Sequence, residues 1–183
     1  MLITISGLHG TGKSTVGRIL AEKLNLDYYS TGNAFRSLAE EYTMSLEEFS
    51  KYVETHPHID KKLDQKIVEM ASQNDDLVVE SLLSGYLLKN KADYTILLKA
   101  PLKTRLQRMM ERDETNYQEK LEETKIREES EIARFKELYN INIIDKSLQK
   151  NTFNIIINTK NLSIEEVVTK ILEIVEKKKS DTT

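Results

Sequence analysis

A run near the amino terminus carries residues suited to chemistry on a phosphate. It reads Gly7-Leu-His-Gly-Thr-Gly-Lys-Ser14 and fits the pattern G-x-x-x-x-G-K-[ST] in full. Glycines at these positions let successive backbone NH groups turn inward around a phosphate, a lysine neutralises phosphate charge, and a serine hydroxyl suits a magnesium ion. We therefore predict a phosphate loop that binds ATP and Mg²⁺, made of Gly7, Leu8, His9, Gly10, Thr11, Gly12, Lys13, Ser14 and Thr15.

Three side chains of this loop carry separate predictions. Lys13 would bridge the β- and γ-phosphates and neutralise charge during transfer, and Ser14 would ligate the metal ion between those phosphates. His9 stands at a variable position of the motif. We favour a solvent-facing spacer over a catalytic base for His9.

The loop needs a strand before it and a helix after it. Over residues 1–6 apolar and polar side chains alternate and branched side chains are frequent, as in a strand. From Lys13 onward apolar residues recur at helical spacing. The motif therefore lies in the strand, loop and helix context that it requires.

The rest of the chain repeats the alternation of strand and helix. Short apolar runs return at 77–79, 94–98 and 153–157, with long helical patterns between them. Strands separated by helices imply right-handed crossovers and a buried parallel sheet. We predict one α/β domain over residues 1–183, a three-layer P-loop NTPase fold with a five-stranded parallel sheet and helices on both faces.

A helical insert over residues 31–74 is predicted between two strands. It holds a helix near residues 34–42, a second helix after a cap at Ser45 with Glu48 three residues on, and a third after Pro57. A second addition, residues 102–139, begins with a helix and is dense in charges of both signs. This polar character suits a lid over a site.

Composition narrows the class of protein. The formal net charge of −3 gives no overall basic field, so we expect no nucleic-acid partner, and the absence of cysteine excludes disulfides and thiolate zinc sites. The three histidines do not suggest a metal cluster. No segment is apolar enough to span a bilayer, so we expect a cytoplasmic protein. We also expect a monomer with small-molecule nucleotide substrates. The tail at 177–183 is expected to be frayed.

Other P-loop classes fit less well than a kinase. A GTPase needs a guanine-reading N-K-x-D, and the best candidate, Asn158-Thr-Lys-Asn161, lacks the aspartate. A motor ATPase normally needs a longer chain. A small chain with a helical insert and an arginine-rich late segment suits a kinase for a small acceptor, because phosphoryl transfer needs cations around the moving group and exclusion of water.

The chain as a whole resembles the archaeal-type cytidylate kinases of the nucleoside monophosphate kinase group. Five segments in order carry the resemblance: Ile3-Thr-Ile-Ser-Gly7 with the phosphate loop, Ser30-Thr-Gly-Asn-Ala-Phe-Arg36, Met44-Ser-Leu-Glu-Glu-Phe49, Arg127-Glu-Glu-Ser-Glu131 with Ala133-Arg134-Phe135, and Ile157-Asn-Thr159.

The resemblance implies an acceptor site in the insert. Thr31 would lie near the pyrimidine, Arg36 would clamp the acceptor phosphate, and Glu131 would position an arginine or contact the acceptor. A guanidinium suits this task because it offers a planar pair of donors to phosphate oxygens. The alternative for Arg36 is a solvated helix charge.

Further cations follow helical offsets of three and four, so that they share a face and could converge on the phosphates. These predicted catalytic arginines are Arg105, Arg108, Arg112, Arg127 and Arg134. The alternative is a salt-bridged exposed helix, because glutamates lie nearby. Glu80 closes a buried strand at the carboxyl edge of the sheet and could hold a magnesium-bound water, or only cap the strand.

Three departures from the family pattern concern the acceptor. Leu82 replaces an arginine that would bind the acceptor phosphate, and Asn33 and Asn142 stand where acids are usual. The resemblance implies transfer of the γ-phosphoryl group of ATP to CMP, with dCMP as a further substrate, and the Leu82 departure favours a different acceptor. Another nucleoside monophosphate, a small metabolite, or an ATP-binding regulator without turnover are the alternatives.

Overall fold

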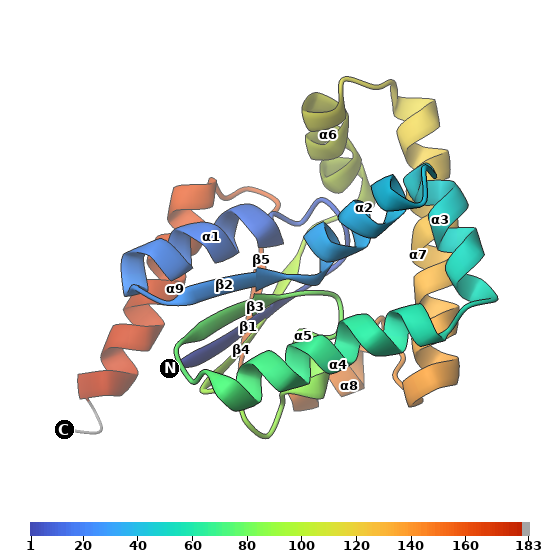
Figure 1. The fold of residues 1–183 in the computed structure, drawn as a ribbon. Helices are drawn as coiled ribbons and strands as arrows, with labels where there is room; N and C mark the ends of the chain where they lie inside the picture. Colours follow the sequence, from blue (N-terminus) through green and yellow to red (C-terminus); the bar gives the residue numbers. More distant parts are fainter. Residues whose placement is uncertain (181–183) are drawn as a thin grey trace.

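The sheet at the centre of the molecule contains five parallel strands in the described part of the chain. A computed structural model describes residues 1–180, and its strands lie in the order β2-β3-β1-β4-β5 (Figure 1). Their bounds are Leu2–Ser6 (β1), Asp27–Ser30 (β2), Leu77–Glu80 (β3), Tyr94–Lys99 (β4) and Ile155–Asn158 (β5). All four strand pairings are parallel, which confirms the predicted P-loop α/β fold.

β2 is a strand that the search for apolar runs in the sequence did not predict. Its residues, Asp-Tyr-Tyr-Ser, include no aliphatic side chain, because this edge strand is only partly covered. Its pairing with β3 places Ser30 directly beside Glu80. The edge strand therefore matters for the site more than for the core.

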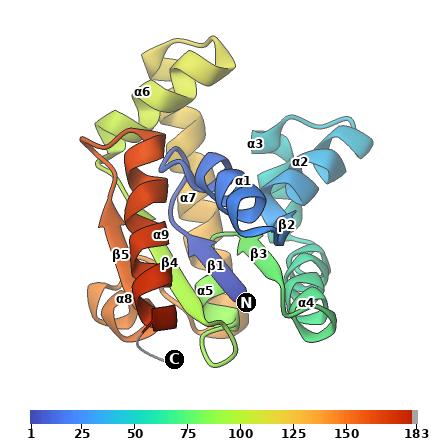
Figure 2. The same ribbon diagram turned by 90° about the vertical axis from the view of Figure 1, so that its left-hand side faces the viewer.

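Helices cover both faces of the sheet (Figure 2). α1 (Lys13–Leu24) and α9 (Ile164–Ser180) pack on one face, where Ile3, Ile96 and Ile171 are fully buried in one cluster. α4 (His58–Gln73) and α5 (Ser84–Leu87) lie on the other face, where Leu77 and Val79 pack against α4. Central strands buried on both sides explain their continuous apolar runs.

The insert forms three helices between β2 and β3, close to the predicted positions. They are α2 (Thr31–Glu41), α3 (Leu46–Glu54) and α4. Ser45 caps α3, accepting a hydrogen bond from the backbone NH of Glu48, whose side chain in turn accepts from the backbone NH of Ser45. This reciprocal pair is the predicted capping box. Phe35, Phe49 and Ile59 give these helices a small core of their own.

The second addition contains two helices, α6 (Leu102–Asp113) and α7 (Tyr117–Tyr139), followed by α8 (Lys146–Thr152). α6 and its connection to α7 rise above the rest of the molecule, and α7 runs behind the insert (Figure 1). α9 continues to Ser180, further than a tail frayed from residue 177 would allow, and residues 181–183 lie outside the described residues. Over residues 1–180, the helices are too short or too polar to cross a membrane.

Gly85 is a position where packing demands glycine. A Cβ built there would lie 2.2 Å from Cε1 of Phe153, and that ring is buried edge-on against Tyr86, at 5.0 Å between ring centroids. We expect Gly85→Ala to lower the free energy of unfolding by about 1–3 kcal/mol, because the ring has no free space to move into. Urea denaturation measures this directly.

Gly32 supplies the matched control. It lies in the first turn of α2, and an added Cβ would meet its nearest neighbour, Oγ of Ser30, at 3.8 Å. Gly32→Ala should be neutral or stabilising by up to about 1 kcal/mol, because alanine favours the helix. Equal losses in the two variants would contradict the packing explanation.

Candidate active site

The phosphate loop joins β1 to α1 and contains glycines in the left-handed backbone conformation. Gly10 and Gly12 have φ angles of 76° and 95°, a region that other residues enter at a cost, and Gly12 is the N-cap of α1. The positive end of the helix dipole therefore points at the space inside the loop. The hydroxyl of Thr11 donates to the carbonyl of Leu8 at 2.8 Å and braces the turn from within.

Lys13 reaches back over this loop. Its Nζ donates to the carbonyl of Leu8 at 3.2 Å and lies 3.8 Å from Oε1 of Glu80. Burial lowers the pKa of Lys13, and the negative charge of Glu80 opposes that shift. A buried ammonium group with only long contacts is well placed to accept phosphate oxygens as partners.

Glu80 accepts several hydrogen bonds at the end of β3. One of its oxygens, Oε2, accepts hydrogen bonds from the hydroxyls of Ser14 at 3.1 Å, Ser30 at 2.6 Å and Tyr28 at 3.4 Å. The Glu80 side chain is 4% exposed. The hydroxyl of Ser14 and the carboxylate of Glu80 are hard oxygen donors of the kind that Mg²⁺ prefers, so the residues present fit that ion.

A cleft of about 950 Å³ connects the phosphate loop to the insert and to α7. Most of the predicted site residues line it: His9, Gly10, Gly12, Lys13, Ser14, Thr15, Thr31, Arg36, Glu80, Arg108, Arg112, Arg127, Glu131 and Arg134. Gly7, Leu8 and Thr11 instead line a smaller cavity of about 70 Å³. Arg105 lines neither of these two cavities.

Arg105 lies in a structural contact at the base of α6. Its guanidinium pairs with both oxygens of Glu128 on α7, and Nη1 also donates to the backbone carbonyl of His9 at 2.9 Å. The side chain is 5% exposed. Its donors toward α7 and the loop are therefore occupied, and a role in catalysis stays a prediction for this residue.

The other two arginines of α6 differ in their bonding partners. Arg108 donates to the hydroxyl and the carbonyl of Thr159, at 2.9 and 2.6 Å, and so links α6 to the loop after β5. Arg112 is 62% exposed and pairs with its neighbour Asp113. Arg112 thus forms an exposed ion pair, and both Arg108 and Arg112 line the cleft, so their role in catalysis stays a prediction.

Arg127 lines the cleft with its donors incompletely satisfied. Its closest carboxylate contacts are 3.6 Å to Glu123 and 3.9 Å to Glu131, both too long for hydrogen bonds, and its buried Nε has no hydrogen-bond partner among the described residues. Buried polar groups without partners are rare in folded proteins. Arg127 therefore has donors free for a ligand.

Arg134, on α7, and Arg36, on α2, differ in how far their charges are compensated. Arg134 donates to Asp60 at 2.6 Å and also contacts Ser130, so its charge is compensated inside the protein. Arg36 donates to the amide oxygen of Asn33 at 2.5 Å. Because Asn33 is neutral, Arg36 keeps its full charge toward the cleft.

Glu131 and His9 form a contact that the sequence did not predict. Nε2 of His9 lies 2.7 Å from Oε2 of Glu131, and the His9 side chain is 20% exposed, so His9 is not a solvent-facing spacer. Burial would raise the pKa of Glu131, but His9, Arg127 and Arg134 outweigh it and bring the pKa to about 2. Burial lowers the pKa of His9, and the negative charge of Glu131 opposes that shift.

Two acids on α4 also line the cleft and were missed. Asp60 and Asp64 are one helical turn apart, 5% and 7% exposed, beside Leu63 and Ile67. Acids at spacing i, i+4 on the apolar face of a helix were a signal available in the sequence, because aspartate is rarely buried without a partner.

The sequence of this chain is similar to those of known cytidylate kinases. The model of the cytidylate kinase-like family matches residues 2–161. A cytidylate kinase from Sulfurisphaera tokodaii is 42% identical over 173 residues, 94% of this chain and 93% of that protein. A cytidylate kinase from Methanocaldococcus jannaschii is 41% identical over 169 residues, 91% and 93% of the two chains.

Solved structures support the fold. An uncharacterized protein from Eubacterium ventriosum has a TM-score of 0.69 at 16% identity, covering 96% of this chain and 98% of its own. Shikimate kinase from Acinetobacter baumannii in complex with shikimate has a TM-score of 0.61 at 19% identity, covering 97% and 94%. At these identities the likeness concerns the fold alone.

The charge of Glu131 predicts a pH-dependent stability. A carboxyl group whose pKa is lowered by folding stabilises the protein above its unfolded pKa, and this contribution is lost as the pH falls toward the folded value of about 2. We expect Glu131→Gln to be less stable than the wild type at pH 7 by roughly 3 kcal/mol, with the difference shrinking between about pH 5 and pH 2.

Urea denaturation at several pH values measures this difference. Glu129→Gln is the control, because Glu129 is an exposed residue of the same helix and should show no such trend. A difference between the wild type and Glu131→Gln that stays constant over this pH range would contradict the assigned charge state.

Proposed function

This chain belongs to the cytidylate kinase-like family, and from that membership we propose that it transfers the γ-phosphoryl group of ATP to CMP, giving ADP and CDP. The observation that carries the proposal is a phosphate loop and a helical insert opening into one cleft, in a chain about 40% identical to cytidylate kinases over more than nine-tenths of its length. We further propose dCMP as a substrate, and a cytoplasmic monomer as the working form.

The triphosphate half of the reaction falls to the phosphate loop. Lys13 and the backbone NH groups from Gly10 to Ser14 would bind the β- and γ-phosphates, supported by the dipole of α1. Ser14 and Glu80 would hold Mg²⁺, which when bound neutralises charge on the phosphates. The hydroxyls of Ser30 and Tyr28 orient Glu80 for this task.

The acceptor half falls to the insert and α7. Arg36, with its charge uncompensated, would hold the acceptor phosphate, and Arg127 would donate to the group in transfer through its free Nε and Nη atoms. An oxygen of the CMP phosphate attacks the γ-phosphorus while the bond from that phosphorus to the β–γ bridging oxygen breaks. The protein supplies no nucleophile, so its residues position the substrates and exclude water.

A panel of acceptors tests the proposal. With ATP and Mg²⁺ present, ADP release should be stimulated by CMP and dCMP well above AMP, GMP and shikimate. Turnover with AMP or a small metabolite but not with a pyrimidine nucleotide would overturn the cytidylate assignment. Tight ATP binding with no acceptor-stimulated release would favour a regulator instead.

Lys13→Ala is the control variant for the same panel. It should lower turnover of CMP by at least about two orders of magnitude, the usual scale for losing a preorganised cation. Near-normal activity in this variant would refute the role given to the phosphate loop.

Arg36→Ala separates the two substrates. Charge-assisted hydrogen bonds to phosphate are strong, so we expect the KM for CMP to rise roughly tenfold or more while the KM for ATP changes less. Lys51→Ala, which removes an exposed cation of the same insert, should leave both values unchanged. The reverse pattern, a larger change for ATP, would assign Arg36 to the wrong substrate.

A further inference from the structure

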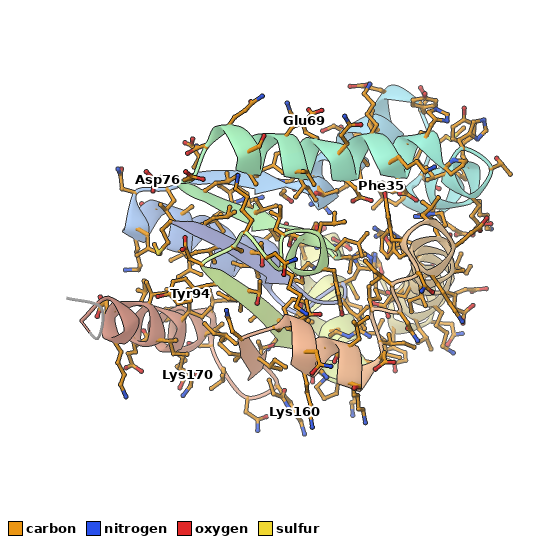
Figure 3. The ribbon with its side chains drawn as sticks, turned by 90° about the horizontal axis from the view of Figure 1, so that it is seen from below. Phe35, Glu69, Asp76, Tyr94, Lys160 and Lys170 are labelled. Atoms are coloured by element: carbon orange, nitrogen blue, oxygen red, sulfur yellow. The ribbon has the colours of Figure 1, made fainter. Side chains whose placement is uncertain are left out.

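The end of the cleft nearest α4 combines flat apolar walls with a carboxylate. Phe35, Leu63 and Phe135 line it together with Asp60 and Asp64. Phe35 lies under α4 on the side toward α7 (Figure 3). Aromatic and aliphatic walls with a few polar groups are typical of a site for a planar ring.

The two carboxylates differ in what they bind. Asp60 accepts from Nε of Arg134 at 2.6 Å, so its charge is already compensated. Asp64 accepts one hydrogen bond through Oδ2, from the hydroxyl of Tyr139 at 2.8 Å. Within residues 1–180, Oδ1 of Asp64 accepts no hydrogen bond, and no cation lies within ion-pair distance of its carboxylate.

The remaining acids of the cleft are accounted for. Glu80 binds three hydroxyls at the phosphate end, and Glu131 is held by His9. The others contact the side chains of Lys51, Gln107, Arg112 or Lys120, and they are Glu47, Glu111, Asp113 and Glu123. Among the described residues, Asp64 is therefore the buried acid of this cleft whose carboxylate is in no ion pair, since Asp60, Glu80 and Glu131 each lie within 4 Å of a basic side chain.

Carboxylate oxygens discriminate between the two pyrimidines. Cytosine presents an exocyclic amine at C4, which donates hydrogen bonds, and uracil presents a carbonyl oxygen at the same place. A carboxylate accepts from the amine and repels the carbonyl. Resting on the function proposed above, we propose that Asp64 accepts a hydrogen bond from the exocyclic amine of the acceptor base and so selects CMP over UMP.

Thr31 supplies a second free group in the same cleft. Its Oγ1 is buried and has no hydrogen-bond partner among the described residues. A hydroxyl can donate to the ring nitrogen or the carbonyl oxygen that cytosine presents beside its amine. An unpaired hydroxyl and an unpaired carboxylate oxygen in one cleft are consistent with a ligand that carries both a donor and acceptors.

The charge state of Asp64 gives the inference a pH signature. Burial, with Asp60 adding to it, raises the pKa of Asp64 to about 7, against the opposing effects of Tyr139 and Arg134. Tyr29, on β2, is the other titratable group that faces it. Above this pH the carboxylate accepts from the amine of CMP, and below it the protonated acid can donate to the carbonyl of UMP.

Asp64→Asn is the central test. An amide can turn either its oxygen or its NH₂ group toward the base, so it should no longer prefer cytosine. We expect the ratio of kcat/KM for CMP over UMP to fall roughly ten- to hundredfold, the scale of one base-reading contact. A ratio within about twofold of the wild type would overturn the inference.

Two matched variants isolate the cause. Asp75→Asn makes the same change on an exposed residue and should leave the ratio unchanged. Tyr139→Phe removes the hydrogen bond to Oδ2 and keeps the carboxylate, so it should retain most of the preference. If Asp64 only braces α7 through Tyr139, then Asp64→Asn and Tyr139→Phe would lower both substrates equally, and the inference would fail.

Binding measurements separate this inference from the proposed function. Calorimetric titration of CMP and UMP without ATP needs no turnover: a wild-type preference for CMP that Asp64→Asn loses supports the inference even if no phosphoryl transfer occurs. Turnover of CMP with an unchanged preference in Asp64→Asn overturns the inference and leaves the function intact. Failure of the wild type to bind either nucleotide overturns both.

The wild type also provides a test that does not depend on a variant folding. Its binding preference for CMP over UMP should rise severalfold between pH 6 and pH 8, with the phosphate titration common to both ligands cancelling in the ratio. A flat ratio across this range would overturn the inference.

Discussion

The hydrogen bonds to Glu80 are the constraint on which the site depends. β3 lies between β1 and β2 in the sheet, so its last residue stands between the two segments that leave the neighbouring strands. At this position Glu80 accepts hydrogen bonds from Ser14, in the phosphate loop, and from Ser30, the last residue of β2 before the insert. Ser30 also accepts from the backbone NH of Asn33 as the N-cap of α2. One buried carboxylate thus fixes the starts of α1 and α2, which both line the cleft.

A second set of contacts ties α7 to the rest of the cleft. Glu128 binds Arg105 of α6, Glu131 binds His9 of the phosphate loop, and Arg134 binds Asp60 of the insert. Breaking one partner of such a buried pair is costly, because the other is left uncompensated. α7 is therefore held in register with all three substrate-facing segments, although its own composition is that of a charged surface helix.

The local signals that the sequence carries explain most of the architecture. The phosphate loop and the capping box at Ser45 depend on near neighbours in the chain, so their residues predict them. β2 has no apolar run because it lies at the edge of the sheet. The pairing of Arg105 with Glu128, the contact of His9 and the isolation of Asp64 arise between segments far apart in sequence, and spacing cannot predict which of many charges will meet.

Leu82 stands at the position where the family resemblance implies an arginine. Its side chain packs against the cluster around Leu83 and Phe135, and it lines both the cleft and the smaller cavity, so its contacts there are apolar. The charge needed by a phosphate must come from cations that the protein has not already compensated. Arg134 is neutralised by Asp60, whereas Arg36 is bound only to a neutral amide. Because Asn33 is neutral, the hydrogen bond that it accepts leaves the charge of Arg36 uncompensated at the cleft.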